Sequence, residues 1–429
     1  MVSIKSTFEY LLSKTIVRKA NPKYPNPMTG IKKAFYFVLF VAMLCTACDQ
    51  DTGQTPEVEE PHDQEVDFLF GADLSYLNQI LDHGGIYSVG GEQQDPYRIF
   101  AEAGTQLARF RIWHNPLWTG EIYGRETPLY NDLEDVESAI GKAKSEGMEI
   151  LLDFHYSDVW ADPGRQEIPA AWREIESLEV LQDSIYQYTY KTLKYLGSKG
   201  LFPEYVQIGN ETNCGMLFTD APENFPKLNV CEGNWQNFKS VAKAAVNAVH
   251  DAAGHSETKV IFHVADPENL DWWFENFTGS PNEVDFDIIG FSYYPLWHTT
   301  ISLTQLESAV SRIKSRFAKD IMMLETAYPW TLEGNDDYTN IFGGQAPLPG
   351  FPYTIEGQRE IMVSMSESMI NAGGLGIIYW EPGWISSDMK DLWGTGSSWE
   401  NCAFFDFEGN LHDGADYVNL LNNKYKINP

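Results

Sequence analysis

Two glutamates each stand directly after a short apolar segment of the chain. Glu211 closes residues 205–211, and Glu325 closes residues 321–325. In a chain that alternates strands with helices, carboxylates at the C-terminal ends of strands lie on the face where (β/α)8 barrels place their catalytic groups. One protonated and one ionised carboxyl group are the acid/base and the nucleophile of a retaining glycosidase. The pair therefore predicts glycosidase chemistry, provided that the remaining segments build such a barrel.

Eight apolar runs of strand length alternate with amphipathic helical stretches from residue 68 onward. The expected strands are residues 68–73, 106–113, 149–155, 205–210, 259–264, 287–292, 321–325 and 376–380. The clearest helices are residues 133–146, 178–197, 235–253, 303–318 and 355–372. Strands that alternate with helices imply parallel pairing, and eight of them favour a closed barrel. No glycine-rich phosphate loop follows the first strand, which argues against a dinucleotide-binding fold.

We therefore predict an α/β fold class and a single (β/α)8 TIM barrel over residues 68–429, with a brief closing helix after Gly414. A chain of 429 residues, 43% of them hydrophobic, is long and apolar enough for this core. Its 13 Trp and 22 Tyr suit a cleft in which aromatic faces stack on sugar rings, although large barrels also bury many aromatics. The net charge of −31 opposes binding to nucleic acid or anionic membranes. A neutral polysaccharide is the expected partner, and we expect a monomer.

The N-terminal region has the composition of a targeting segment. Ile31-Lys32-Lys33 is basic, and the apolar stretch 34–44 that follows is too short to span a bilayer. It runs into Leu-Cys-Thr-Ala-Cys, which resembles a bacterial lipoprotein signal with Cys48 as the lipidated residue. We expect residues 1–48 to be a leader and the acidic residues 49–67 to be a flexible tether. The protein would then be lipid-anchored in a bacterial cell envelope, at the outer membrane or cell surface, with no other membrane contact.

Met28 makes a better start for this signal than Met1, because residues 1–27 contain two proline-rich turns and no secretory pattern. The hypothesis is that residues 1–27 are an extension of the true chain. An intact mass of the unprocessed product that includes Met1 would refute it. Farther along, Cys214 and Cys231 could pair across one loop in an oxidising compartment, but spacing alone leaves their geometry open. No cluster of cysteine and histidine indicates zinc.

Polar residues collect where the expected strands end. An arginine near the nucleophile would keep it ionised. Both Arg109 and Arg111 are candidates for this role, and Arg111 is preferred because it lies nearer the end of its strand. Asn210, beside the acid/base, could donate a hydrogen bond to a sugar hydroxyl, and Trp380 could form the floor under the sugar ring.

At this point a resemblance becomes specific. Residues 152–163 read Leu-Asp-Phe-His-Tyr-Ser-Asp-Val-Trp-Ala-Asp-Pro, and residues 207–211 read Gln-Ile-Gly-Asn-Glu. Residues 325–328 read Glu-Thr-Ala-Tyr, and residues 379–384 read Tyr-Trp-Glu-Pro-Gly-Trp. Over residues 68–417 the chain resembles glycoside hydrolase family 53, the arabinogalactan endo-β-1,4-galactanases of a large clan of retaining barrels.

The resemblance implies that Glu211 is the acid/base and Glu325 the nucleophile. It also implies a set of residues around the bond that is cleaved, to which we add Asp158 from the motif after the third strand: Arg111, His155, Asp158, Asn210, Tyr293 and Trp380. His155 could instead orient Glu211 without contacting substrate. Trp118, Trp297 and Trp384 are either outer subsites or loop packing, and Glu381 is expected to form a structural turn.

One feature departs from the family. Several bacterial members bind calcium after the seventh strand through Asp-x-Asp-x-His-x-Asn, whereas residues 334–340 here read Gly-Asn-Asp-Asp-Tyr-Thr-Asn. Only Asp336 and Asn340 keep oxygen ligands at matching places, and calcium prefers about six to eight oxygens. These two residues are the calcium candidates, and we expect that no cofactor is required.

The predicted function is that of a retaining endo-β-1,4-galactanase that acts on arabinogalactan through a glycosyl-enzyme intermediate. One alternative is another retaining β-glycanase of the same clan, acting on a glucan or a mannan. The other is a non-catalytic surface glycan-binding lipoprotein, against which the retention of both glutamates argues.

Overall fold

A computed structural model describes residues 66–427 apart from 127, 255 and 280–282. The predicted leader, the lipidation site Cys48, Met28 and nearly all of the tether lie outside the described residues. Those assignments therefore stay predictions.

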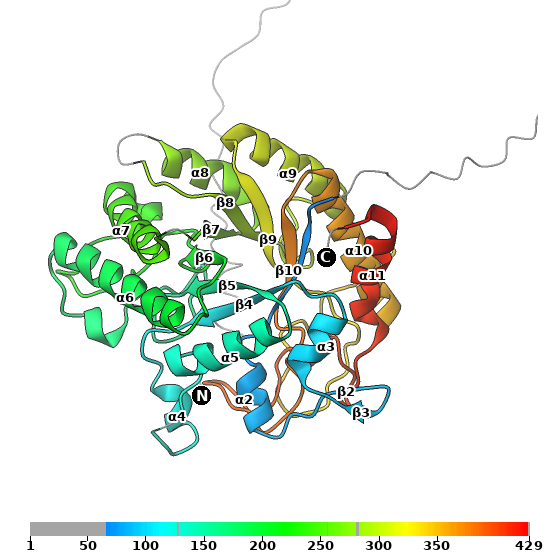
Figure 1. Ribbon diagram of the computed structural model, residues 1–429. Coiled ribbons are helices and arrows are strands. Elements are labelled where there is room, and N and C mark those ends of the chain that lie inside the picture. Colours follow the sequence, from blue (N-terminus) through cyan, green and yellow to red (C-terminus); the bar gives the residue numbers. More distant parts are fainter. Residues whose placement is uncertain (1–65, 127, 255, 280–282, 428–429) are drawn as a thin grey trace, which may run out of the picture. The chain divides into compact units, whose positions relative to one another are not determined.

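The centre of the fold is a closed barrel of eight parallel strands (Figure 1). In chain order the barrel strands are β1 (Leu69–Asp73), β4 (Leu107–Ile112), β5 (Glu149–Phe154), β6 (Tyr205–Ile208), β7 (Lys259–Ala265), β8 (Ile288–Ser292), β9 (Asp320–Thr326) and β10 (Gly376–Tyr379). Each strand pairs with the next, and β10 closes the barrel on β1. All eight expected strands are present, which confirms the predicted fold class.

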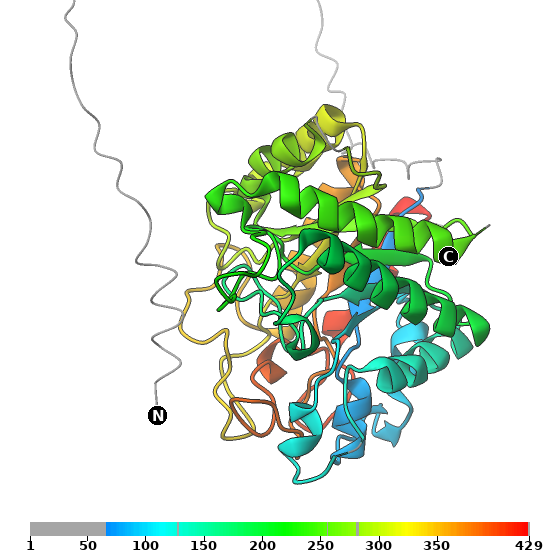
Figure 2. The ribbon, with the colours of Figure 1, turned by 90° about the vertical axis from the view of Figure 1, so that its left-hand side faces the viewer.

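Helices lie outside the barrel, and α6 and α7 run side by side along its wall (Figure 2). The five helices expected from periodicity are α5 (Leu133–Ser145), α6 (Leu178–Ser198), α7 (Trp235–Ala253), α9 (Leu303–Phe317) and α10 (Ile355–Asn371). Four of these begin at a side chain that caps free backbone N–H groups: Asp132, Ser177, Ser302 and Thr354. The expected closing helix is α11 (Tyr417–Tyr425).

The sequence did not predict the short elements. These are α2 (Leu77–Asp82), α3 (Pro96–Glu102), α4 (Trp118–Glu121), α8 (Leu270–Thr278) and a two-stranded hairpin of β2 (Ser88–Val89) and β3 (Glu92–Gln93). Each spans too few residues for a helical or alternating period to stand out. In chain order α2, the hairpin and α3 lie between β1 and β4, α4 lies between β4 and α5, and α8 lies between β7 and β8.

Apolar side chains fill the inside of the barrel and give way to polar ones toward its C-terminal end. The apolar layer comes from strands all around the barrel: Leu107, Leu151, Ile261, Ile288, Met322, Leu324 and Ile378. Because successive residues of a strand point to opposite faces, the residue two positions farther along also points inward. After Leu107, Leu151 and Ile261 these positions hold Arg109, Asp153 and His263.

Strand β9 contains one extra residue after Met323 compared with β8 on one side and β10 on the other. Phe291 pairs with Met323 but Ser292 pairs with Glu325, and on the other side Ile377 pairs with Met323 but Tyr379 with Thr326. The extra residue is a β-bulge, which changes the direction of the side chains that follow it. Leu324 therefore packs in the apolar layer while Glu325, directly after it, also reaches the polar end of the barrel.

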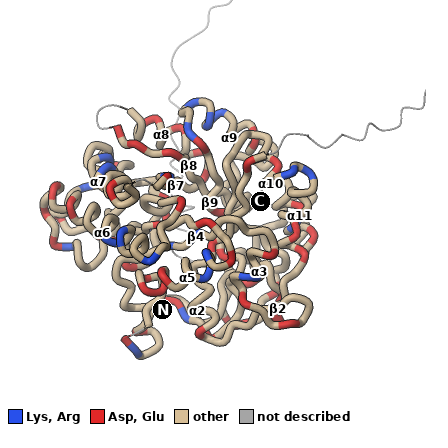
Figure 3. The backbone as a smooth tube through the Cα atoms, viewed as in Figure 1, with Lys and Arg blue, Asp and Glu red and all other residues tan. Residues whose placement is uncertain are grey.

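Charged residues of both signs are spread over the helices and loops, with the acidic ones more numerous (Figure 3). Among the helices of the described part, none combines the length and the apolar character needed to cross a bilayer.

Candidate active site

A small hollow of about 80 Å³ opens at the C-terminal ends of the barrel strands. Its lining joins residues of the three strands β1, β4 and β9 with residues that follow the ends of β5, β6 and β10: Asp73, Arg109, Arg111, His155, Trp160, Ala161, Asp162, Asn210, Glu211, Glu325 and Trp380. A larger hollow of about 1030 Å³ lies on the outer flank of α5 and α6, and it contains no strand-end carboxylate pair. The chemistry is therefore expected at the smaller one.

Glu325 is held by two donors. Its Oε1 accepts a hydrogen bond from Arg109 Nη1 at 2.8 Å, and its Oε2 accepts one from the hydroxyl of Tyr294 at 3.0 Å. Burial raises the pKa of Glu325, whereas Arg109 and the Tyr294 hydroxyl act in the opposite direction. Two donors to the carboxylate stabilise its ionised form, which is the form a nucleophile needs.

Glu211 has a different environment. It follows Gly209 and Asn210 in a tight turn after β6, and its φ of +46° lies in the left-handed region that non-glycine residues rarely adopt. Burial raises the pKa of Glu211 well above its ordinary value, and repulsion by Glu325 raises it further. Ser292 supplies the hydrogen bond to Glu211 Oε1, at 2.6 Å. An environment of this kind favours the protonated form of Glu211, which is the form that a general acid needs.

The two carboxyl groups are close together. One carboxylate oxygen of Glu211 and one of Glu325 lie within 4.8 Å of each other. Retaining glycosidases space their carboxyl groups about 5–5.5 Å apart, and inverting ones about 6.5–9.5 Å. A separation this short fits direct attack by one carboxylate and not attack by a water held between the carboxylate and the sugar.

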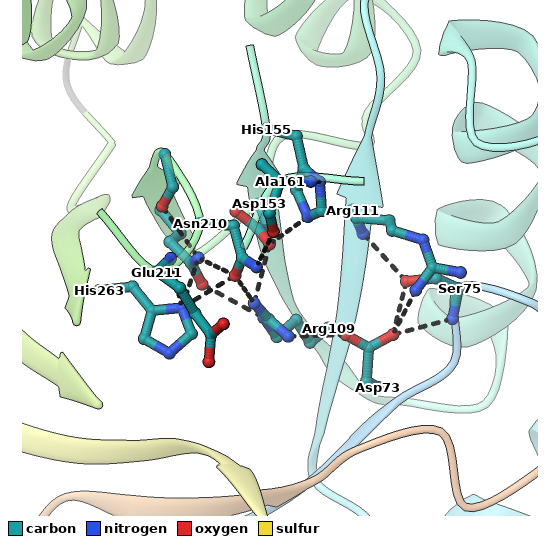
Figure 4. A network of polar contacts seen from close by, with 12 residues as sticks. Asp73, Ser75, Arg109, Arg111, Asp153, His155, Ala161, Asn210, Glu211 and His263 are labelled. Carbon is teal, nitrogen blue, oxygen red and sulfur yellow. Dashed lines mark hydrogen bonds and ion pairs between the residues drawn. The ribbon is translucent and has the colours of Figure 1, made fainter. Parts of the chain in front are cut away.

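Arg109, rather than Arg111, is the arginine that contacts Glu325. Besides Glu325, Arg109 donates to Asp73 and Asp153, each at 2.8 Å, and to Asn210 Oδ1 at 2.7 Å (Figure 4). The guanidinium is buried to 1% exposure, so these partners replace its water. The prediction that Arg111 is the arginine beside the nucleophile was therefore wrong.

Arg111 instead pairs with Glu381 and packs against aromatic rings in the wall of the pocket. It donates to Glu381 at 2.6 Å, and its guanidinium lies 4.1 Å from the ring centre of Tyr76 and 4.2 Å from that of Trp160. Cations stack favourably on aromatic faces at this range. Arg111 still lines the hollow. Glu381 is buried against Arg111, so the expected structural role of Glu381 agrees with its place in the structure.

Asn210 and His155 both lie at the pocket. The amide of Asn210 is fixed because its oxygen accepts from Arg109 while its Nδ2 donates to the carbonyl of Ala161 at 2.8 Å. His155 Nδ1 accepts from the indole N–H of Trp113 and from the backbone N–H of Ala161, so its proton is on Nε2, 3.1 Å from Asp153. Among the described residues the polar partners of His155 are Trp113, Ala161 and Asp153, so His155 does not orient Glu211 through a direct hydrogen bond.

Two of the other candidates have structural partners outside the pocket. The hydroxyl of Tyr293 donates to the carbonyl of Ile301, and it is the next residue, Tyr294, that reaches Glu325. Asp158 accepts from the backbone N–H groups of Asn115 and Ala170, so it ties two loops together. Neither Tyr293 nor Asp158 lines the hollow.

Aromatic rings surround one side of the pocket. Trp380 lines it, 5.8 Å from the ring centre of Trp160 and 4.7 Å from that of Trp399, which stands nearly perpendicular to it. A half-buried tryptophan held by two others presents a fixed apolar face, which suits stacking on a sugar ring. Trp384, in contrast, is 2% exposed and therefore packs in the core.

Comparisons with known proteins agree with this geometry. The model of the glycosyl hydrolase family 53 matches residues 69–416. The chain belongs to glycosyl hydrolase family 53. It is 41% identical over 343 residues to an arabinogalactan endo-beta-1,4-galactanase of Cellvibrio japonicus, covering 79% of this chain and 86% of that protein. An endo-beta-1,4-galactanase of Bacillus subtilis is 32% identical, with 80% of this chain and 78% of that protein covered.

Solved structures show the same relationship. The GH53 catalytic domain of Ignisphaera aggregans superposes with a TM-score of 0.74 at 33% identity, covering 84% of this chain and 98% of that one. A structure from a study of two fungal beta-1,4-galactanases gives a TM-score of 0.68 at 25% identity, covering 82% of this chain and 98% of that one. As a family 53 member the protein is a glycoside hydrolase.

Asp336, one of the two calcium candidates of this family 53 chain, has hydrogen-bond partners within the part of the chain that the structure describes. Asp336 is engaged by backbone N–H groups of Tyr338 and Ser397, one at each carboxylate oxygen. The one group of three potential ligands found there is Glu211, His263 and Glu325. The guanidinium of Arg109 bonded to Glu325 opposes a divalent cation at that place. Calcium at Asp336 and Asn340 stays untested.

Cys214 and Cys231 form a disulfide, with Cα atoms 5.0 Å apart, in the loop after β6. This confirms the pairing that spacing had left open. The loop carries Asn213, whose side chain bonds the backbone of Ala265 in both directions.

Sequence reasoning missed several residues of the site: Asp73, Asp153, Asp162, Gln207, His263 and Tyr294. A usable signal existed for some of them. His263 is the one ionisable residue inside the otherwise apolar run of residues 260–265, and Asp73 is the last residue of β1. A polar residue at an inward position near the end of a barrel strand predicts membership of the polar layer.

Proposed function

We infer that this glycoside hydrolase is a retaining endo-β-1,4-galactanase that cleaves internal β-1,4-galactosidic bonds of galactan or arabinogalactan. The substrate follows from the names of its family 53 relatives. The observation that carries the mechanism is the pair of neighbouring carboxyl groups in unlike environments. Arg109 and Tyr294 donate to Glu325 and favour its ionised form, whereas burial and repulsion by Glu325 raise the pKa of Glu211 well above its ordinary value.

In the first step Glu325 attacks the anomeric carbon from the face opposite the leaving sugar. The glycosidic C–O bond breaks, and Glu211 gives its proton to the departing oxygen. The product on the enzyme is a glycosyl ester of Glu325. In the second step Glu211, now a carboxylate, takes a proton from water, and the resulting hydroxide attacks the anomeric carbon and frees Glu325. Two inversions give net retention.

Two neighbouring groups support these steps without exchanging protons with the substrate. Asn210 is fixed by Arg109 and Ala161 beside Glu211, where a sugar hydroxyl would lie. Trp380 supplies the apolar face on which the ring rests. The sequence of acid, nucleophile and water needs no metal or organic cofactor, since the two carboxyl groups supply the proton transfer and the attack.

The test is a panel of polysaccharides incubated with the wild type and with Glu325→Gln. We expect release of oligosaccharides from β-1,4-galactan by the wild type alone, and binding of galactan by both proteins. The control is Glu333→Gln, which changes an exposed glutamate in the loop after β9 and should leave the rate unchanged. Cleavage of β-glucan or mannan with none of galactan would overturn the substrate assignment. Binding by the wild type without cleavage would support a glycan-binding protein instead.

We propose in addition that Cys48 is lipidated and anchors the enzyme to a bacterial envelope. Support comes from the basic and apolar residues 31–44 and the following Leu-Cys-Thr-Ala-Cys. Labelling with a fatty acid in the native host should mark the wild type and not Cys48→Ala. Release of an unlabelled wild-type protein into the periplasm or medium would contradict the anchor.

A further inference from the structure

The hydroxyl of Ser292 lies between the acid/base Glu211 and a buried histidine. Ser292 Oγ is 2.6 Å from Glu211 Oε1 and 2.8 Å from His263 Nε2. Ser292 and His263 both have no exposed surface, so water cannot replace either bond. Figure 4 shows His263 directly beside Glu211. The mechanism above gives neither Ser292 nor His263 a role in catalysis.

A serine hydroxyl has a single hydrogen, so this chain of atoms has two possible directions. In one, His263 Nε2 carries a proton and donates to Ser292, and Ser292 donates to Glu211. In the other, Nε2 is bare and accepts from Ser292, so that Ser292 can only accept a proton from Glu211. The first direction stabilises the carboxylate of Glu211, and the second stabilises its carboxylic acid. The tautomer of His263 decides between them.

The other ring nitrogen of His263 faces donors. The backbone N–H of Glu211 points at Nδ1 from 3.4 Å. Gln207 Nε2 also lies 3.1 Å from Nδ1, but its two hydrogens can go to the carbonyl of Gly209 at 3.0 Å and to Asn210 Oδ1 at 3.1 Å. The orientation of the Gln207 amide is fixed, because Arg109 Nε donates to its Oε1 at 3.2 Å. The Glu211 N–H requires an unprotonated Nδ1, which leaves the proton of a neutral imidazole on Nε2. Burial keeps His263 neutral by lowering its pKa well below the ordinary value.

One contact favours the opposite tautomer. Asn210 Oδ1 lies 2.9 Å from His263 Nδ1 and could accept a proton from it. That oxygen already accepts from Arg109 Nη2 at 2.7 Å and from Gln207 Nε2 at 3.1 Å. A carbonyl oxygen has two lone pairs, so these donors fill it. The balance of donors around Nδ1 therefore sets the proton on Nε2.

We propose that His263 and Ser292 are positioning residues that act on the acid/base: His263 directs the Ser292 hydroxyl toward Glu211 Oε1, so that Oε2 is the oxygen that exchanges the catalytic proton. This inference rests on the proposed function, in which Glu211 is the acid/base. With Oε1 occupied by a donor in both half-reactions, the proton that leaves with the sugar and the proton taken from water use the same oxygen. The donor also limits how far the pKa of Glu211 rises.

Other ionisable groups also face Glu211, and a test must leave their charges unchanged. These are Glu325 from β9, Asp162 from the loop after β5 and Arg109 from β4. His263 itself faces Arg109 and His155. Ser292→Ala changes none of these charges and removes only one oxygen, so a change in the pH profile reports the hydroxyl.

The test compares the dependence of kcat/KM on pH for the wild type, Ser292→Ala and Ser366→Ala on β-1,4-galactan. Glu211 must be protonated in the first step, so its pKa sets the alkaline limit of activity. Loss of a donor to the carboxylate raises that pKa, and the alkaline limit of Ser292→Ala should move up by about one pH unit. Ser366, a buried serine of α10 whose hydroxyl has no hydrogen-bond partner among the described residues, is the matched control and should leave the alkaline limit in place.

If the alkaline limit of kcat/KM moves to lower pH in Ser292→Ala, Ser292 accepts a hydrogen bond from Glu211. If this limit does not move, Ser292 has only a structural role. Either result overturns the proposal. A wild type without activity on galactan would count against the proposed function instead, so the two failures are distinct. The tautomer can be read without turnover from the imidazole ¹⁵N signals of the wild type, assigned through their absence in His263→Gln. A protonated Nε2 and a bare Nδ1 are expected, and the reverse would contradict the proposal.

Discussion

Arg109 donates to Glu325 across the inside of the barrel, from β4 to β9, at 2.8 Å. The same guanidinium holds Asp73, Asp153 and Asn210. A single buried cation thus joins the carboxylate proposed as nucleophile to the amide beside the acid/base. The bulge in β9 is what brings Glu325 within reach of it, since a regular strand would have placed Leu324 and not Glu325 on the inner face.

Replacing Arg109 should therefore change both stability and the ionisation of Glu325. In Arg109→Lys the single ammonium group cannot reach all five hydrogen-bond partners of the guanidinium, and buried carboxylates lose their donors. We expect a loss of about 3 kcal/mol in the free energy of unfolding. Arg109 lowers the pKa of Glu325, so weakening that contact raises it, and the acidic limit of activity moves to higher pH.

Arg111→Lys is the matched comparison, because Arg111 is equally buried but pairs with Glu381. Urea unfolding should show a comparable loss of stability, while the acidic limit of kcat/KM stays where it is in the wild type. The account would be contradicted if the acidic limit moved in Arg111→Lys and stayed fixed in Arg109→Lys.

Two adjacent tyrosines should respond differently to loss of their hydroxyl groups. Tyr294→Phe removes the second donor to Glu325, so kcat should fall by roughly tenfold or more and the acidic limit should rise. Tyr293→Phe removes only a bond to the carbonyl of Ile301, and its kcat should stay within about twofold of the wild type. Steady-state rates on galactan decide this, and equal losses in both variants would refute the assignment of Tyr294.

The two glutamates can be told apart by rescue with azide. Glu211→Ala should lose roughly 10²- to 10⁴-fold in rate on galactan. On an aryl galactobioside with a good leaving group it should still form the glycosyl-enzyme, because that group departs unprotonated. Azide should then attack this intermediate and release the β-galactobiosyl azide.

In Glu325→Ala no glycosyl-enzyme can form. Azide that enters the vacated space would attack the substrate itself and give the α-azide. The anomeric configuration of each product is read by NMR. A β-azide from Glu325→Ala, or an α-azide from Glu211→Ala, would mean that the two roles are exchanged.

The sequence was sufficient for the barrel and for both glutamates, because strand length, alternation with helices and strand-end position are properties of short segments. The choice between Arg109 and Arg111 depended instead on the direction of each arginine side chain. Strand position locates a Cα atom, whereas a long side chain such as arginine ends several ångströms away, in a direction set by its neighbours. Arg111 is turned aside by the rings of Tyr76 and Trp160, which belong to loops whose paths the sequence did not define.

The same limit applies to Tyr293, Asp158 and His263. Strand β8 ends at Ser292, so alternation no longer predicts which of the next two tyrosines faces the pocket. Asp158 lies in a loop, where no period exists. His263 was detectable as a polar residue in an apolar strand, but its link to Glu211 runs through Ser292 on a different strand. That contact depends on the register of β7 against β8.

The stereochemistry of the first-formed product tests the central claim most directly. ¹H NMR of galactan oligosaccharides during the first minutes of hydrolysis, before mutarotation, shows which anomer the wild type releases. The neighbouring carboxyl groups of Glu211 and Glu325 predict the β-anomer, with the α-anomer appearing later as the sugars equilibrate. Release of the α-anomer first would mean inversion, and it would contradict a covalent intermediate on Glu325.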